Sequence, residues 1–136
     1  MAIRFIKIAV FYLACGICLG LYMGMTTQFT LAPVHAHLNL LGFAVMTLAG
    51  LVYRAFPEAA ETRLAKVHFW LHNVGLPPLM ISLALMLKGN AALEPVVGIT
   101  SMVVGAGVFA FIINVWLSVR APVASGGATR AALATS

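Results

Sequence analysis

Residues 34–56 read VHAHLNLLGFAVMTLAGLVYRAF, an apolar stretch whose only charged residue, Arg54, stands near its end. A helix needs about 20 mainly apolar residues to cross the hydrocarbon core of a bilayer, so this stretch predicts a membrane-spanning helix. Two histidines, His35 and His37, stand near its start. A polar ring in hydrocarbon costs free energy unless something binds it, and ionisable residues in membrane helices are therefore functional candidates.

The rest of the chain has the same character. Of its 136 residues, 62% are hydrophobic and 8% are charged, and the mean hydropathy is +1.05. Soluble domains carry about 25% charged residues, so this composition predicts an integral membrane protein. We expect an all-α four-helix bundle over residues 1–120, followed by a flexible cytoplasmic tail over 121–136. The expected helices cover about 5–27, 34–56, 67–87 and 95–119.

The basic residues are unevenly distributed between the two sides of this bundle. Lys88 stands alone on one side, and the other seven flank the opposite ends of the helices: Arg4, Lys7, Arg54, Arg63, Lys66, Arg120 and Arg130. The positive-inside rule then predicts a multi-pass protein of the cell inner (cytoplasmic) membrane with both termini in the cytoplasm. The net charge of +5 therefore indicates orientation and not a nucleic-acid partner.

His35 and His37 are the first candidates for chemistry, because imidazole is the commonest metal ligand. Residues two apart on a helix point about 200° away from each other, so the pair is poorly placed to hold one small ion. Each ring could instead face a planar cofactor, which favours haem. The alternative is two interfacial histidines that bond to backbone and water. The acidic residues, Glu58, Glu61 and Glu94, all lie in or beside loops, which excludes paired buried carboxylates.

A second histidine pair, His68 and His72, is spaced four residues apart and lies on one helical face, where two rings can share a metal ion. His68 is close enough to the predicted interface to be solvated, and His72 lies one turn deeper. The alternatives are a solvated or structural role, or a second cofactor site at His72. Cys15 and Cys18 also share a helical face, as packing residues or as a redox or copper pair.

The sequence from Val34 to Leu76 resembles the tenth and eleventh helices of the catalytic subunit (subunit I) of haem-copper oxidases. The matching pieces are His35-x-His37, the segment from Gly50 to Phe56-Pro57, and His68-Phe69-Trp70 followed by Gly75. They recur in the family's order over about residues 33–80. By this resemblance, His35 matches the axial ligand of the oxygen-reactive haem and His37 matches an axial ligand of the low-spin haem. His68 matches a residue that binds no haem.

The departures from that family limit what the resemblance implies. Its copper site needs a His followed four residues later by Tyr and a His-His pair, and this chain has neither, so no copper is expected. The Arg-Arg pair that holds haem propionates is also missing, which leaves Lys88 as the nearby cation. We therefore do not expect oxygen reduction by the oxidase mechanism.

The resemblance implies a b-type haem protein that works in electron transfer or in binding a diatomic gas such as NO or O₂. Subunit I resembles three arcs of four helices, so a chain of one arc predicts a homo-oligomer, a trimer, with haem between neighbouring copies and a respiratory-chain redox partner. The alternatives are a non-haem accessory or assembly subunit of an oxidase complex, and a metal or solute carrier that uses the seven Met residues.

Overall fold

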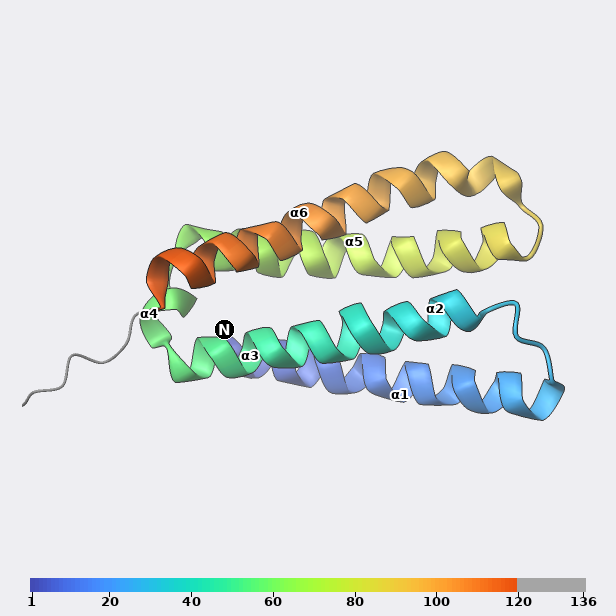
Figure 1. Ribbon diagram of the computed structural model, residues 1–136, viewed down its shortest axis with the longest axis horizontal. Helices are drawn as coiled ribbons and strands as arrows, with labels where there is room; N and C mark the ends of the chain where they lie inside the picture. The colour runs from blue at the N-terminus through green and yellow to red at the C-terminus, as the bar shows by residue number, and fades with distance from the viewer. Residues whose placement is uncertain (120–136) are drawn as a thin grey trace, which may run out of the picture.

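The computed structural model describes residues 1–119 and is helical almost throughout (Figure 1). In chain order the elements are α1 (Ala2–Thr26), α2 (Ala32–His37), η1 (Leu38–Val45), α3 (Met46–Ala55), α4 (Pro57–Ala60), α5 (Arg63–Leu87), η2 (Ala91–Leu93) and α6 (Glu94–Ser118). The elements α2, η1 and α3 form one continuous span of 24 residues. The prediction of an all-helical chain with four helices of membrane-spanning length is confirmed. The predicted tail, 121–136, lies outside the described residues.

The helix that contains the second histidine pair begins earlier than predicted, at Arg63 and not at residue 67. Thr62 is the reason, because its Oγ1 accepts a hydrogen bond of 3.1 Å from the backbone N–H of Ala65 and so caps the helix. A capping side chain satisfies an N–H that has no partner in the first turn, which extends the helix toward the cap. The short helix α4 lies within the predicted loop 57–66 and starts at Pro57, a favoured first residue of a helix.

The chain folds as two helical hairpins, one formed by α1 with α2–η1–α3 and the other by α5 with α6 (Figure 1). Glycines allow the helices of each hairpin to approach closely. A Cβ at Gly20 in α1 would lie 2.9 Å from the ring of His35, and one at Gly107 in α6 would lie 3.1 Å from the backbone N of His72. Small residues at such contacts are typical of helix packing in membranes. A Cβ at Gly24, four residues after Gly20 in α1, would meet no atom within 4 Å.

The two hairpins meet through an aromatic cluster near the end of the bundle that carries α4, which we call the α4 end. The ring of His68 lies between Phe5 and Phe111, with centroid distances of 5.0 Å to each. Tyr53 packs against the same two phenylalanines at 5.4 and 5.7 Å. Aromatic rings at these separations pack favourably, so this cluster joins α1, α3, α5 and α6.

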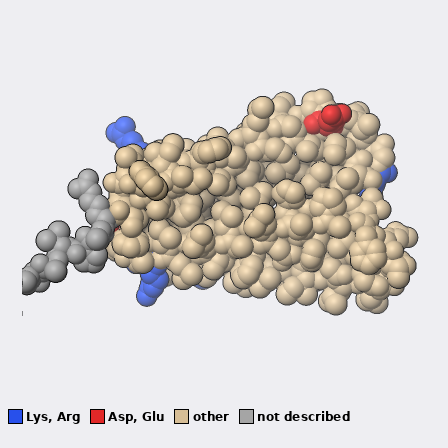
Figure 2. All heavy atoms as spheres, viewed as in Figure 1, with Lys and Arg blue, Asp and Glu red and all other residues tan. Residues whose placement is uncertain are grey.

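Large apolar side chains cover the outside of the bundle. Trp116 and Met25 are 87% and 86% exposed, and Leu, Ile, Val and Phe residues are exposed along all four long helices. Figure 2 shows one face on which charged residues lie only toward the two ends. Soluble monomers rarely expose apolar surface on this scale, and hydrocarbon is the solvent that such a surface fits. The chain is therefore a multi-pass membrane protein.

Candidate functional site

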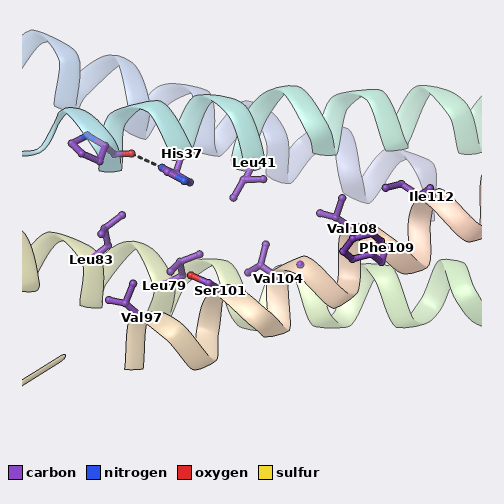
Figure 3. A pocket seen from close by; sticks show the side chains of 12 residues that line it. His37, Leu41, Leu79, Leu83, Val97, Ser101, Val104, Val108, Phe109 and Ile112 are labelled. Atoms are coloured by element: carbon purple, nitrogen blue, oxygen red, sulfur yellow. Dashed lines mark hydrogen bonds between the residues drawn. The ribbon is translucent and has the colours of Figure 1, made fainter. Parts of the chain in front are cut away.

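An apolar groove runs between the two hairpins, from Pro33 at the end of the bundle opposite α4 as far as Ile112 on α6 (Figure 3). Its cavity volume is about 410 Å³. The lining residues come from α2 and η1 on one wall and from α5 and α6 on the other: Pro33, His37, Leu41, Leu79, Leu83, Val97, Ser101, Val104, Gly105, Val108, Phe109 and Ile112. Only His37 and Ser101 contribute polar side-chain atoms to this set. Ligand pockets with mainly apolar walls and a few placed polar groups are the usual sites for cofactors.

His37 points into this groove from the last turn of α2 (Figure 3). Its Nδ1 lies 2.7 Å from the carbonyl oxygen of Pro33. A carbonyl only accepts, so Nδ1–H donates this bond and the lone pair of the neutral ring is on Nε2. Metal-bound histidines usually donate their other ring N–H to a carbonyl or carboxylate in this way, which orients the ring. His37 is therefore prepared to act as a ligand through Nε2.

The helix changes its winding immediately after His37. Residues Leu38–Val45 form the π-helix η1, although nothing in the sequence of this segment distinguishes it from an ordinary apolar helix. π-helical turns are rare and occur often at functional sites. Here the carbonyl oxygen of Leu41, within η1, accepts a hydrogen bond of 3.1 Å from Nε2–H of His72 on α5. The π-helix thus links one wall of the groove to the second histidine pair.

His35 faces a different neighbour. Its Nδ1–H donates to the carbonyl oxygen of Gly16 at 2.9 Å, and its ring lies against Gly20 of α1. Asn39, one turn later, donates to the backbone oxygen of His35 at 2.8 Å. The angular separation of residues 35 and 37 is therefore seen in the structure, because one ring faces α1 and the other faces the groove. The structure does not bring the two rings to one site.

Lys88, the predicted partner for haem propionates, lies at the same end of the bundle as His35 and His37 but outside the groove. It borders a separate hollow with a mixed polar and apolar lining: Tyr22, Gln28, Thr30, Leu31, Leu87 and Gly89. The two hollows share no lining residue. A role for Lys88 at the groove stays a prediction.

The second histidine pair is completely buried in the aromatic cluster. His68 and His72 are both 0% exposed, so His68 is not solvated. Nδ1 of His68 lies 3.2 Å from the Tyr53 hydroxyl, and the two imidazole rings are 5.5 Å apart at an angle of 81°. Nε2 of His68 and Nδ1 of His72 have no hydrogen-bond partner among the described residues. Unpaired buried polar atoms are rare and call for an explanation.

Two polar residues of this region were not singled out in the sequence. Asn114 of α6 is 0% exposed and donates to the Ala59 carbonyl at 2.8 Å and to the Tyr53 hydroxyl at 3.5 Å. Thr62 donates to Oδ1 of Asn114 at 2.8 Å. The available signal was the isolated amide within the apolar stretch 95–119, since a polar residue in a membrane helix usually faces the bundle interior.

Within residues 1–119, no group of three or more His, Cys, Asp and Glu side chains is close enough to hold one ion. Cys15 and Cys18 are free thiols, half-buried and exposed respectively. Comparisons with protein-family models, with curated proteins and with solved structures find no match to this chain.

Proposed function

We propose that this protein is a membrane cytochrome of b type, in which Nε2 of His37 binds haem iron from the wall of the groove. One observation carries the proposal. The only imidazole that lines the groove donates Nδ1–H to the Pro33 carbonyl at 2.7 Å, which leaves Nε2 as its ligand atom. The resemblance of residues 33–80 to haem-copper oxidase subunit I supports the same assignment.

The groove fits a flat apolar group in its chemistry. Both walls are aliphatic or aromatic except at His37 and Ser101, so they would keep water away from a bound haem. Burial and the identity of the iron ligand are two properties by which a protein sets the reduction potential of haem. Gly105 lines the α6 wall, and a Cβ placed there would contact nothing, so this glycine keeps open space beside the groove. When bound, the haem supplies one-electron transfer or the binding of NO or O₂.

One chain presents one histidine to the groove, because His35 is turned toward α1. A haem held by His37 of a single chain would have a place for a diatomic gas, or a second copy of the chain would supply its other ligand. We propose the second arrangement for the electron-transfer form, as a homo-oligomer that we expect to be a trimer. The exposed apolar faces of all four long helices leave room for such contacts.

The positions of the Lys and Arg residues support one orientation of the bundle in the membrane. Of the Lys and Arg residues described, Lys88 is at one end of the bundle, while Arg54, Arg63 and Lys66 flank the α4 end, where Arg4 and Lys7 also lie in the first turns of α1. By the positive-inside rule we place the α4 end in the cytoplasm and the His37 end of the groove toward the outer face of the cytoplasmic membrane.

The test is the haem content and visible spectrum of the purified protein from haem-replete cells. We expect a Soret band in the wild-type protein, its loss in His37→Ala, and its retention in His35→Ala. Retention in His37→Ala together with loss in His72→Ala would move the site to the buried pair and contradict the proposal. A colourless wild-type protein would also contradict it, and would favour the non-haem accessory or assembly role.

A further inference from the structure

The π-helix η1 separates two side chains of the second long helix that have fixed places in the bundle. His37 comes before η1 and faces the groove, and Tyr53 comes after it and belongs to the aromatic cluster. A π-helix forms hydrogen bonds between residues five apart, where an α-helix bonds residues four apart, so each of its turns takes up more residues. The winding of η1 therefore sets the direction of His37 relative to Tyr53.

A change of η1 to α-helical winding would displace one of these two side chains. One residue of an α-helix turns the chain by about 100°. If Tyr53 kept its contacts with Phe5 and Phe111, a change of one residue in the winding would turn His37 by about that angle, out of the groove. If His37 kept its place, Tyr53 would leave the cluster. The wider winding satisfies both positions.

Two side chains bond to backbone carbonyls where this winding begins and within it. Asn39 donates to the carbonyl of His35 at 2.8 Å, and Nε2–H of His72 donates to the carbonyl of Leu41 at 3.1 Å. In an α-helix the Leu41 carbonyl would accept from the backbone N–H of Val45, and a side chain that enters the ladder at such a carbonyl disturbs it. Among the described residues, His72 is the only side chain that bonds to the backbone of η1 from another helix.

The position of His72 is fixed by its own neighbours. The residue is 0% exposed, and a Cβ at Gly107 would lie 3.1 Å from its backbone N, so α6 packs directly on this turn of α5. The π-helix is also held by α1, because a Cβ at Gly42 would lie 2.6 Å from the side chain of Tyr12. The donor for the Leu41 carbonyl is therefore supplied by tertiary packing, whereas the residues of η1 suit an ordinary helix.

We propose that His72 is a positioning residue, whose hydrogen bond to the Leu41 carbonyl holds η1 in its π winding and thereby keeps the ring of His37 in the groove. The bond requires hydrogen on Nε2 of His72, which the carbonyl acceptor already fixes. His68, one turn away, makes no hydrogen bond to η1 and takes no part. The winding belongs to the haem-free protein, and only its effect on haem binding rests on the proposed function.

The winding is tested by NMR on the haem-free full-length protein, labelled with ¹⁵N and ¹³C, in detergent micelles. Couplings across hydrogen bonds identify the acceptor of each N–H. In the wild type we expect bonds between residues five apart within Leu38–Val45 and a coupling from Nε2–H of His72 to the Leu41 carbonyl. In His72→Phe, which keeps an aromatic ring but has no donor, we expect bonds between residues four apart and loss of the contacts between the His37 ring and the methyl groups of the groove. In His72→Gln, whose amide N–H replaces the donor, we expect the wild-type pattern.

His68→Phe is the matched control, because it makes the same change at an equally buried position one turn away on α5. It should keep the wild-type pattern in η1. The proposal is overturned if bonds between residues five apart persist in His72→Phe, if they are lost equally in His68→Phe, or if His37 keeps its groove contacts after η1 has rewound. Circular dichroism reports whether each variant is folded, and His72→Leu decides the question if His72→Phe is not.

The consequence for haem is measured separately, by titration of the same variants with haem. We expect His72→Phe to bind haem at least tenfold more weakly than the wild type, and His72→Gln to bind it as the wild type does. Unchanged affinity in His72→Phe would show that His72 does not position His37 for haem. A wild-type protein that binds no haem contradicts the proposed function alone, since the hydrogen-bond pattern of η1 still tests the role of His72.

Discussion

The two histidine pairs of this chain differ in what surrounds them. His35 and His37 lie in α2, near the start of the second long helix, and each donates Nδ1–H to a backbone carbonyl. Nε2 of His37 stays free beside the groove. His68 and His72 are fully buried, His68 is bonded to Tyr53 and His72 to Leu41, and their rings lie 5.5 Å apart. The comparison shows that the surroundings of a histidine decide what it can contact: the ring of His37 is open to a ligand in the groove, whereas His68 and His72 contact only other residues of the bundle.

The largest expected effect comes from filling the groove without touching either pair. In Gly105→Leu the new side chain enters open space beside the groove, so the helix should still fold while the proposed haem would be displaced. We expect haem per chain, measured by absorbance after purification, to fall tenfold or more. Gly98→Leu is the control, because Gly98 lies on the same helix, a Cβ there would also meet no atom within 4 Å, and Gly98 does not line the groove. Equal haem content in both variants would place the haem elsewhere.

We expect the free energy of unfolding to depend on the buried pair, His68 and His72, and hardly at all on His37. Truncating a buried side chain leaves a cavity and unpaired polar atoms, so we expect His72→Ala to lower the free energy of unfolding by about 2–4 kcal/mol. His37 is exposed and bonds only within its own helix, and we expect His37→Ala to change it by less than about 0.5 kcal/mol. Titration with SDS, followed by circular dichroism of the haem-free protein, measures both. A larger loss for His37→Ala would show that the groove histidine is structural.

Asn114 contacts the buried pair indirectly, through the Tyr53 hydroxyl that bonds to His68. Asn114→Leu removes the bonds to Ala59, Thr62 and Tyr53, and we expect a loss of about 1–2 kcal/mol in the same SDS titration. The control is Asn73→Leu, because Asn73 donates only to Phe69 of its own helix and should cost little. If the two variants unfold alike, the amide of Asn114 does not join α6 to α4.

The smallest effect is expected on the other pair, at the contact between His35 and α1. Gly20→Ala places a Cβ 2.9 Å from the His35 ring, which forces the ring to shift and should cost about 1 kcal/mol. Gly24→Ala meets no atom and should be neutral or slightly stabilising, since alanine favours a helix more than glycine does. Equal unfolding curves for the two variants would mean that His35 is not held against α1.

The parts of the fold that follow from local chemistry could be read from the residues. Four apolar stretches of bilayer length predicted four helices, and Pro33, Pro57 and Pro95 lie in the first turns of helices as their missing N–H requires. The predicted start of α5, residue 67, is four residues too late, because the hydropathy pattern does not show that Thr62 caps the helix. The π-helical winding of Leu38–Val45 could not be expected, since its residues suit an ordinary helix equally well.

The candidate site was predictable only in part. The spacing of His35 and His37 already required the two rings to diverge, but it could not tell which one faces α1. His68 was open to a solvated or a structural role, and Phe5 and Phe111, which enclose it, lie far away along the chain. The contact between Tyr53 and Asn114 could not be predicted, because each is an isolated residue in an apolar stretch and a hydrogen bond between positions 61 residues apart leaves no local pattern.

By itself, the sequence determined that the chain crosses a membrane four times in helices and which of its few polar residues are exceptional, because hydropathy and helical period act over short distances. Only the tertiary structure decided that His37 lines a groove, that His35 packs against Gly16 and Gly20, and that His68 bonds to Tyr53 and His72 to Leu41. These properties depend on which helix lies beside which, and in a bilayer that choice is made by close packing and polar contacts between distant segments.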